Sequence, residues 1–358
     1  MNAADVLAAD VALVRERAAK ELAALDGAEV LVTGGAGFLG YLLLHVLAEQ
    51  GTRVTVYENF RRGRRQWLDD LVEGSPNLQL VEHDISKPLP ADAERFDWVI
   101  HAASIASPIF YRQFPIETID ANVNGIRSLL DLGRTRAEAG RPMNGILFFS
   151  TSEIYGDPSP DAIPTNETYR GFVSCTGPRA CYDESKRLGE TLCVNFARQY
   201  GVQVTSARPF NNYGPGLNIN DRRVIPDLAR DIFAGRDLVL LSDGAATRTF
   251  CYVADSIVGY LKVLVNGRAG EAYNIGTETP EISMRQLAES LRDNSKDLFG
   301  YAGRVITEIS DDADYLVDNP NRRCPDITKA RTELGYDPVV GIDDGLRRSL
   351  TWYQGNQS

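Results

Sequence analysis

The sequence predicts an α/β fold in which a doubly wound parallel sheet is followed by a smaller, mixed α/β lobe. Short apolar segments rich in β-branched and aromatic residues alternate with longer segments whose apolar residues recur at helical spacing. With 358 residues and 43% hydrophobic content, the chain can also bury a large core. Strand–helix alternation of this kind is typical of a parallel sheet that is covered by helices on both faces.

The predicted elements follow in a regular order. Residues 1–26 are expected to form a helical N-terminal extension, and the first strand-type segment covers residues 28–33. Further strand-type segments lie at residues 52–60, 78–85, 96–104, 145–150 and 202–210. From residue 211 the sequence becomes turn-rich, with shorter strands. We therefore expect a nucleotide-binding domain at 27–210 and mainly a substrate-binding lobe at 211–358, with some exchange of chain between them.

A glycine-rich turn joins the first strand to its helix. In the segment TGGAGFLG, residues Gly34, Gly37 and Gly40 have the spacing of a Rossmann-type cradle, where a pyrophosphate meets the backbone at a helix N-terminus. The next strand ends in Glu58, whose carboxylate suits the two hydroxyls of a ribose and repels a 2′-phosphate. This pattern predicts NAD as the cofactor.

Four arginines directly follow this strand, and they bear on the choice between NAD and NADP. They are Arg61, Arg62, Arg64 and Arg65. As cations they weaken the preference for NAD, whereas in a solvated loop they would leave it unchanged. Two later strand ends also point to a cofactor. Asp84 stands where such folds meet the adenine, and the small residues around Ala102 let a cofactor lie over the sheet.

The segment GPRACYDESKR, residues 177–187, places Tyr182 and Lys186 four residues apart. On a helix this spacing puts the phenol and the ammonium on one face, one turn apart. A nearby cation favours phenolate, so we expect the pKa of Tyr182 to fall from about 10 toward neutral pH. Such a phenol can take a proton from a sugar or alcohol hydroxyl while hydride leaves the same carbon. The same spacing also occurs by chance on helix surfaces, so the pair alone does not establish catalysis.

Composition excludes several classes of function. The net charge of −11 argues against a nucleic-acid or membrane-surface binder. The five cysteines lack CxxC spacing and the three histidines are scattered, so neither a disulfide framework nor a metal site is predicted. Reduced thiols, the lack of a long apolar run and an N-terminus unlike a signal peptide predict a cytoplasmic protein.

Taken together and in this order, TGGAGFLG, Glu58, STSEIYG at 150–156 and the Tyr182/Lys186 pair resemble the extended short-chain dehydrogenase/reductase family of nucleotide-sugar enzymes. Within that family, the segments STSEIYGDP, GPRACYDESKR, NDRRV, TRTFCYVAD and RRCPDI are most similar to UDP-glucuronate decarboxylases (UDP-xylose synthases). The resemblance covers the chain from about residue 30 to 352. It implies a Rossmann-type NAD domain and a nucleotide-sugar substrate.

The resemblance also implies roles for individual residues. Tyr182 would be the base, Thr151 would supply the hydroxyl that joins it, and Lys186 would hold the nicotinamide ribose. The residues implied in NAD binding are Gly34, Gly37, Phe38, Leu39, Gly40, Glu58, Asn59, Asp84, Ile85, Ala102, Asn122, Tyr182 and Lys186. Those implied in substrate binding are Tyr111, Glu153, Asn211, Arg223, Arg248 and Arg323. Arg223 and Arg248 would meet the diphosphate, unless they form surface ion pairs.

The two residues after Thr151 distinguish reactions within the family. Dehydratases acting on dTDP-glucose carry Asp-Glu there, and simple 4-epimerases usually carry no glutamate. The pair Ser152–Glu153, with Arg323, is similar to the decarboxylases. The resemblance thus implies oxidation at C4 to a β-keto acid, loss of CO₂ and re-reduction to a UDP-pentose. Glu153, Ser152 or a water would protonate C5, and Arg323 would bind the carboxylate or act near the leaving group.

Several alternatives stay open. The chain could be an NDP-sugar 4-epimerase or 4,6-dehydratase, and GDP-mannose dehydratases also carry Ser-Glu at this place. A decarboxylase could instead release a 4-keto pentose and NADH. A non-catalytic NAD-binding sensor is a further alternative, although such proteins commonly lose the tyrosine or the lysine.

Two further expectations concern assembly and a departure from the family pattern. The helices following Ile119 and Tyr182 have apolar faces that predict a homodimer interface, or else core packing. The family segment that usually reads RIFNTFGPR is RPFNNYGPG here, with Gly216 in place of the terminal arginine.

Overall fold

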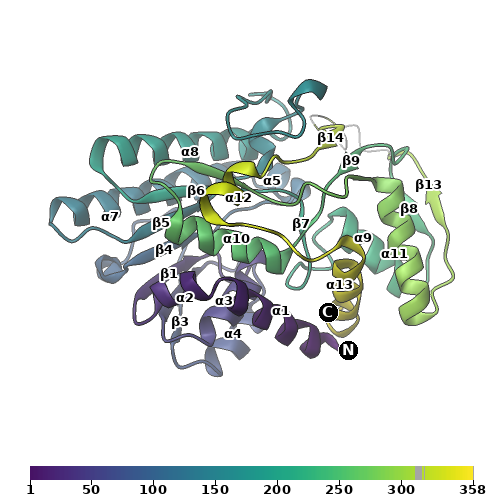
Figure 1. The fold of residues 1–358 in the computed structure, drawn as a ribbon, viewed down its shortest axis with the longest axis horizontal. Helices are drawn as coiled ribbons and strands as arrows, with labels where there is room; N and C mark the ends of the chain where they lie inside the picture. Colours follow the sequence, from purple (N-terminus) through teal and green to yellow (C-terminus); the bar gives the residue numbers. More distant parts are fainter. Residues whose placement is uncertain (311–316, 318, 358) are drawn as a thin grey trace.

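Seven parallel strands form the central sheet of the computed structural model, which describes residues 1–310, 317 and 319–357 (Figure 1). Their order across the sheet is β11-β6-β5-β4-β1-β2-β3. The strands are β1 (Glu29–Thr33), β2 (Arg53–Glu58), β3 (Leu78–Glu82), β4 (Trp98–His101), β5 (Gly145–Phe149), β6 (Val204–Pro209) and β11 (Ala272–Ile275). Because β1 pairs with β2 on one side and β4 on the other, the chain winds outward from β1 in both directions. The predicted doubly wound parallel α/β fold is confirmed.

Helices cover both faces of this sheet. Val30 and Val32 of β1 belong to the same apolar cluster as α3 (Phe38–Ala48) and α10 (Val253–Asn266). Leu31, between them, belongs to the cluster of α7 (Ile126–Glu138) and α8 (Ala180–Tyr200) on the other face. Successive strand residues point to opposite faces, so a sheet buried on both faces needs the uninterrupted apolar runs of its strands.

The helical segment predicted from Pro115 onward is interrupted. After α5 (Pro108–Gln113), it consists of α6 (Pro115–Asp120), a π-helical turn at Ala121–Gly125 and α7. Helices α6 and α7 and the π-turn all contact α8. Because π-turns are frequent at functional sites, the position of Asn122 within this turn is relevant to the site.

The N-terminal extension is built into the body of the protein. It forms two helices rather than one, α1 (Ala3–Arg17) and α2 (Ala19–Leu25), because Ala18 leaves helical geometry at φ −112° and ψ 24°. Helix α1 contacts α3, α10 and the C-terminal helix α13 (Ile342–Gly355), which places the two termini near each other (Figure 1). Its Asp10 is fully buried and accepts hydrogen bonds from the Tyr252 hydroxyl at 2.6 Å and from Arg348 Nη1 at 3.0 Å.

The remaining chain builds a smaller mixed lobe around α9 (Val224–Phe233), α11 (Met284–Phe299) and α13. Its short strands are β7 (Asn212–Tyr213), β8 (Leu238–Leu240), β9 (Thr247–Arg248), β10 (Cys251–Tyr252), β12 (Ile282–Ser283), β13 (Val305–Thr307) and β14 (Arg322–Arg323). They pair as β7 with β10, β8 with β13, and β9 with both β12 and β14. Strand β11 and helix α10 lie beyond residue 210 in sequence yet complete the main sheet and one of its faces. The division of the chain at residue 210 stays a prediction.

The other helices are α4 (Arg65–Glu73) and α12 (Thr328–Leu334), and the short 3₁₀ segments are Ala91–Arg95, Ser152–Tyr155 and Pro160–Ala162. Among the residues described, no helix is both long enough and apolar enough to cross a membrane.

Candidate active site

A cavity of about 840 Å³ opens at the carboxyl ends of the central strands. The loops after β1, β2, β4, β5 and β6 line one part of it, and residues from α8 and the smaller lobe line the rest. Ligands of open parallel sheets bind at this edge, where the strand order reverses. Every residue predicted to bind cofactor or substrate lines this cavity except Asn122.

The glycine turn has the shape of a phosphate cradle. Gly34 has φ +75°, and a Cβ there would lie 2.6 Å from the Ala103 Cα. A Cβ on Gly40 would lie 2.4 Å from the Gly35 carbonyl oxygen. Gly37 is the N-cap of α3, so the backbone amides of the first helical turn have no partner within the helix and lie at the cavity wall. A dinucleotide pyrophosphate fits this arrangement.

Glu58 is buried at the end of β2 and is anchored by backbone amides. Its carboxylate accepts hydrogen bonds from the N–H groups of Ala36 at 3.1 Å, Asn59 at 3.1 Å and Phe60 at 2.9 Å. Burial raises the pKa of this carboxyl, and the three amides partly offset that rise. A carboxylate offers about four acceptor positions, so capacity for a ribose hydroxyl remains.

The four arginines after β2 are all engaged by other side chains. Their partners are Glu117 for Arg61, Asp221 for Arg62, Asn218 for Arg64 and Glu82 for Arg65. Arg61 and Arg65 pair with carboxylates, whereas Arg62 and Arg64 reach residues of the smaller lobe. The arrangement favours NAD, as the carboxylate of Glu58 does.

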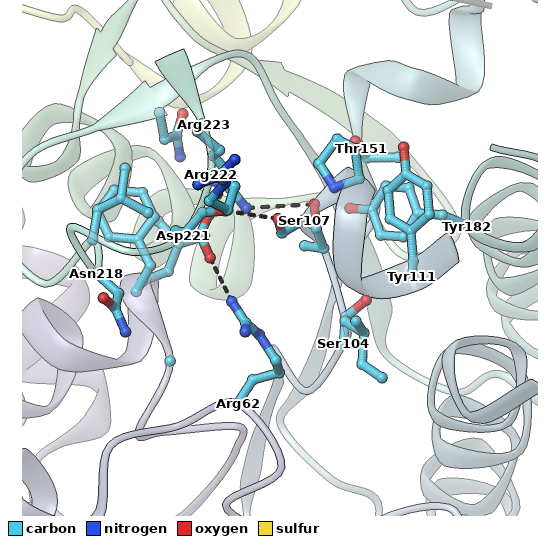
Figure 2. Close-up of a pocket in the computed structure, with 18 of the residues that line it drawn as sticks. Arg62, Ser104, Ser107, Tyr111, Thr151, Tyr182, Asn218, Asp221, Arg222 and Arg223 are labelled. Carbon is cyan, nitrogen blue, oxygen red and sulfur yellow. Dashed lines mark hydrogen bonds and ion pairs between the residues drawn. The ribbon is translucent and has the colours of Figure 1, made fainter. Parts of the chain in front are cut away.

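Tyr182 and Lys186 lie one turn apart on the buried face of α8, as predicted. The Tyr182 side chain hydrogen-bonds the Thr151 side chain, and Figure 2 shows the two next to each other at the cavity wall. Thr151 follows β5 and also caps the 3₁₀ turn after it by accepting the Glu153 N–H at 3.2 Å. The side-chain nitrogen of Lys186 donates a hydrogen bond to the Phe149 carbonyl at 2.6 Å.

The expected fall in the Tyr182 pKa does not occur in the protein alone. Burial raises the pKa of Tyr182 to about 12, and the hydrogen bond from Thr151 offsets only part of that rise. Burial also lowers the pKa of Lys186 to about 7, so this amine is only partly charged at neutral pH. The prediction was wrong because it counted the attraction between the two groups and left out the cost of burying both.

Glu153 is held between two arginines. Arg323 binds it in bidentate fashion, with Nη1–Oε1 at 2.7 Å and Nη2–Oε2 at 2.5 Å, and Arg179 Nη2 lies 2.5 Å from the same Oε2. Burial alone would raise the pKa of Glu153, but the two guanidiniums outweigh it and hold the pKa at about 2. Glu153 is therefore ionised and cannot donate a proton in this arrangement, contrary to one of the roles expected for it.

Strand register brings Arg248 next to Arg323. In the small sheet, β9 and β14 run parallel and pair these two residues at their Cα positions. Arg248 donates to the carbonyl groups of Thr247 at 2.7 Å, Asn321 at 3.2 Å and Pro320. Burial lowers the pKa of Arg248 to about 9, and the neighbouring Arg323 adds to that effect. Arg248 is buried and donates to backbone carbonyl groups, so the alternative of a surface ion pair does not describe it, whereas Arg223 does pair with Asp221.

Sequence reasoning missed Arg179 and one contact of Tyr111. Arg179 stands three residues before Tyr182, which is one helical turn, and that spacing could have placed it beside the site. It is also 3.7 Å from the carboxylate of Asp183. The ring of Tyr111, from α5, stacks on that of Tyr182 with 5.2 Å between centroids and 7° between planes. Its buried hydroxyl has no hydrogen-bond partner among the described residues.

Asn122 and His101 lie behind the cavity wall. Asn122 donates its amide to the Ser185 hydroxyl at 2.9 Å, between Tyr182 and Lys186 on α8. It therefore supports α8, and it does not line the cavity. The cofactor contact expected for it stays a prediction. His101 hydrogen-bonds Thr33 at 2.7 Å, and burial lowers the pKa of its imidazole to about 3, so it stays neutral.

Asn211, Gly216 and Arg223 line the opposite part of the cavity. Asn211 has φ +42° and donates its amide to the Thr249 carbonyl at 2.8 Å, which stabilises an unfavourable backbone geometry at the site. At Gly216, with φ +88°, a Cβ would lie 2.8 Å from Tyr41 Cβ. An arginine, which is usual there, would therefore clash with Tyr41 in this backbone conformation. Arg223 Nε pairs with Asp221 at 2.8 Å.

Within the described residues, no group of three or more His, Cys, Asp or Glu side chains is arranged to hold a metal ion.

Residues 30–276 match the model of a protein family described as the NAD dependent epimerase/dehydratase family. The chain belongs to this family. It is 37% identical over 337 residues to UDP-glucuronic acid decarboxylase 1 of Xenopus tropicalis. The matched region covers 94% of this chain and 74% of that protein. It is also 37% identical over 318 residues to UDP-glucuronic acid decarboxylase 6 of Arabidopsis thaliana, and this match covers 88% of this chain and 86% of that protein.

Solved structures of other enzymes share the fold. The dTDP-glucose 4,6-dehydratase DesIV of Streptomyces venezuelae, solved with NAD bound, superposes with a TM-score of 0.75 and 28% identity, over 92% of this chain and 98% of that one. Family membership, as predicted from the sequence, is confirmed. With the glycine cradle and Glu58, it identifies NAD as the cofactor.

Proposed function

We propose that this member of the family is an NAD-dependent UDP-glucuronate decarboxylase that forms a UDP-pentose. The observation that carries the proposal is the pair of arginines on Glu153, beside the Thr151/Tyr182 pair. Among the residues that the structure describes, three guanidiniums, those of Arg179, Arg248 and Arg323, lie around two buried carboxylates, Glu153 and Asp183, and the exposed Asp157 also acts on Arg248. Guanidiniums favour a carboxylate ligand, so this cluster suits a hexuronate better than a neutral hexose, the substrate of an epimerase or dehydratase.

The curated relatives support the same choice. At 37% identity, two proteins from a frog and a plant that span most of this chain are named UDP-glucuronic acid decarboxylases. Their names bear on the substrate, whereas the fold and the Tyr182/Lys186 pair are common to decarboxylases, epimerases and dehydratases.

The first step is removal of a proton from the C4 hydroxyl of the sugar. Tyr182 is placed to accept this proton, and the Thr151 hydroxyl hydrogen-bonds the tyrosine and orients it. NAD, when bound, supplies the hydride acceptor for C4 and a positive charge that favours the phenolate of Tyr182. Stacking of Tyr111 on Tyr182 keeps the phenol ring in one orientation and excludes water from that side.

The second step is loss of CO₂ from the β-keto acid. The electron pair of the C5–C6 bond moves into the C4 carbonyl, and the resulting enolate oxygen is hydrogen-bonded by Tyr182 and Thr151. Protonation at C5 then gives the 4-keto pentose. Because Glu153 is ionised, we assign this proton to a water molecule that Glu153 holds or to the Ser152 hydroxyl, and bulk water replaces the proton that is consumed. Return of hydride to C4, with the proton from Tyr182, completes the UDP-pentose.

The proposal is tested by incubating the purified protein separately with UDP-glucuronate and with UDP-glucose and analysing the nucleotides by mass spectrometry. We expect a UDP-pentose or a 4-keto pentose from the first substrate and no turnover of the second. Epimerisation or dehydration of the neutral sugar, with UDP-glucuronate unchanged, would establish the alternative reaction instead.

We further propose that the protein acts as a homodimer. On α6, Ile116 and Ile119 are 64% and 37% exposed, and Leu188 on the neighbouring α8 is 47% exposed. These residues form an apolar surface on the two helices expected to make the interface. Light scattering after gel filtration should give twice the mass of the chain, and an Ile116→Asp/Leu188→Glu variant should be monomeric. A monomeric parent protein would remove this part of the proposal.

A cytoplasmic location is also proposed. Its support is that all five cysteines are free thiols, two of them not buried. Fractionation of cells that express the tagged protein would test it, and recovery in a membrane or secreted fraction would contradict it.

A further inference from the structure

The carboxylate of Asp221 lies between two arginines that come from opposite sides of the cavity (Figure 2). Its Oδ1 is 2.9 Å from Arg62 Nη2, and its Oδ2 is 2.8 Å from Arg223 Nε. Arg62 belongs to the loop after β2, which begins at the cofactor residue Glu58. Arg223 is the N-cap of α9 in the smaller lobe, where the diphosphate of the sugar nucleotide is expected.

Each member of this Arg62–Asp221–Arg223 bridge is held by neighbouring structure. Asp221 is 8% exposed, and its backbone carbonyl accepts the Ser107 hydroxyl at 2.8 Å. The guanidinium of Arg62 lies over the ring of Phe110, 3.2 Å from its centroid. Arg223 also donates to the Ala106 carbonyl at 3.5 Å. The bridge is therefore an ordered feature of the cavity wall and not a contact between two mobile surface chains.

The charges in the bridge determine what Arg223 can offer to a ligand. With both arginines present, the single carboxylate is shared and the bridge carries one net positive charge. Without Arg62, both oxygens of Asp221 would be available to Arg223 in bidentate fashion, and the pair would be neutral. Arg223 would then face a diphosphate with its charge already compensated.

We propose that Arg62 is a positioning residue for the nucleoside diphosphate, which acts through Asp221 to keep Arg223 available for phosphate. The inference rests on the proposed function only in assigning the diphosphate to Arg223. It links the loop next to the cofactor with the substrate lobe, and it gives one of the four unexplained arginines a specific role.

The test is calorimetric titration of UDP into the NAD-saturated protein. Arg62→Gln should raise the Kd for UDP about tenfold, the effect of losing one charge-assisted phosphate contact. Arg65→Gln is the matched control, because Arg65 follows Arg62 by three residues at the start of α4, pairs with Glu82 and does not line the cavity. It should change the Kd less than twofold. Adding Asp221→Asn to Arg62→Gln should restore most of the affinity, because an amide cannot neutralise Arg223.

Three results would overturn the inference. They are an unchanged Kd in Arg62→Gln, equal losses in Arg62→Gln and Arg65→Gln, and no recovery in the Arg62→Gln/Asp221→Asn double variant. A wild-type protein that binds no UDP would also overturn it, since Arg223 would then not face a diphosphate. UDP binding that follows the predicted pattern, without decarboxylation of UDP-glucuronate, would refute only the proposed reaction.

Discussion

Replacing Arg323 by glutamine should remove the preference of the site for a substrate that carries a carboxylate. Arg323 is 8% exposed and makes two of the three short contacts to Glu153. Among the described residues, Arg323 is one of three guanidiniums around Glu153 and Asp183. Arg323→Gln removes one of these positive charges, so an incoming carboxylate would meet less compensating charge.

The size of the effect follows from the contact that is lost. A hydrogen bond between charged groups contributes about 1.5–3 kcal/mol, which corresponds to about 10- to 150-fold in Kd. We expect a loss of this size for UDP-glucuronate and less than a threefold change for UDP-glucose, which has no carboxylate. Titration calorimetry of both ligands with the NAD-loaded protein measures the two values.

Arg322→Gln is the matched control for this experiment. Arg322 is the neighbouring residue of β14, but its side chain is 44% exposed and pairs with Glu281 at 2.7 Å. The Arg322→Gln variant should bind UDP-glucuronate and UDP-glucose with the same Kd values as the parent protein. Equal losses for the two ligands in Arg323→Gln would refute the reasoning, because Arg323 would then not distinguish a carboxylate from a hydroxymethyl group.

Three further predictions concern the cofactor site, the base and the N-terminal extension. Tyr182→Phe should lower turnover by at least about 10²-fold while the Kd for UDP stays within twofold, and retained turnover would contradict the role of Tyr182 as base. Gly34→Ala should weaken NAD binding and lower the melting temperature, since the added Cβ would clash with Ala103. The control Gly140→Ala, at φ +71° with open space around it, should lower the melting temperature less, through backbone strain alone. Burial raises the pKa of Asp10 to about 6 from 3.8, so its contribution to stability is fully present below pH 4 and is lost as pH rises through 6. Relative to Asp10→Asn, the wild-type free energy of unfolding should therefore increase by about 1.4 kcal/mol from pH 7.5 to pH 5, and parallel pH profiles would contradict this.

Features encoded by local spacing could be predicted from the sequence. The turn at Gly34, Gly37 and Gly40 and the Tyr182/Lys186 pair each depend on neighbouring residues in one strand–turn–helix unit or one helix. Their position at the carboxyl edge of the sheet then follows from the parallel topology. The strands of the main sheet could also be predicted from local sequence, because burial on both faces of the sheet requires continuous apolar runs.

Features that depend on long-range packing could not be predicted in this way. Arg248 and Arg323 are brought together by the register of β9 and β14, which no local pattern records. The Arg62–Asp221 contact joins residues 159 positions apart. The sign of the Tyr182 pKa shift was missed because burial, which dominates it, is a property of the folded protein. The π-turn at Ala121–Gly125 also escaped prediction, because the spacing of apolar residues does not distinguish a single π-turn from an α-helix.

The most direct test of the proposed function uses UDP-glucuronate labelled with ¹³C at C6. If the arginines around Glu153 bind the carboxylate while Tyr182 supports oxidation at C4, the label should appear as ¹³CO₂, with one unlabelled UDP-pentose or 4-keto pentose nucleotide formed per CO₂. Tyr182→Phe should release neither product. Retention of the label in a UDP-hexuronate, together with turnover of a neutral NDP-hexose by the same preparation, would contradict the account.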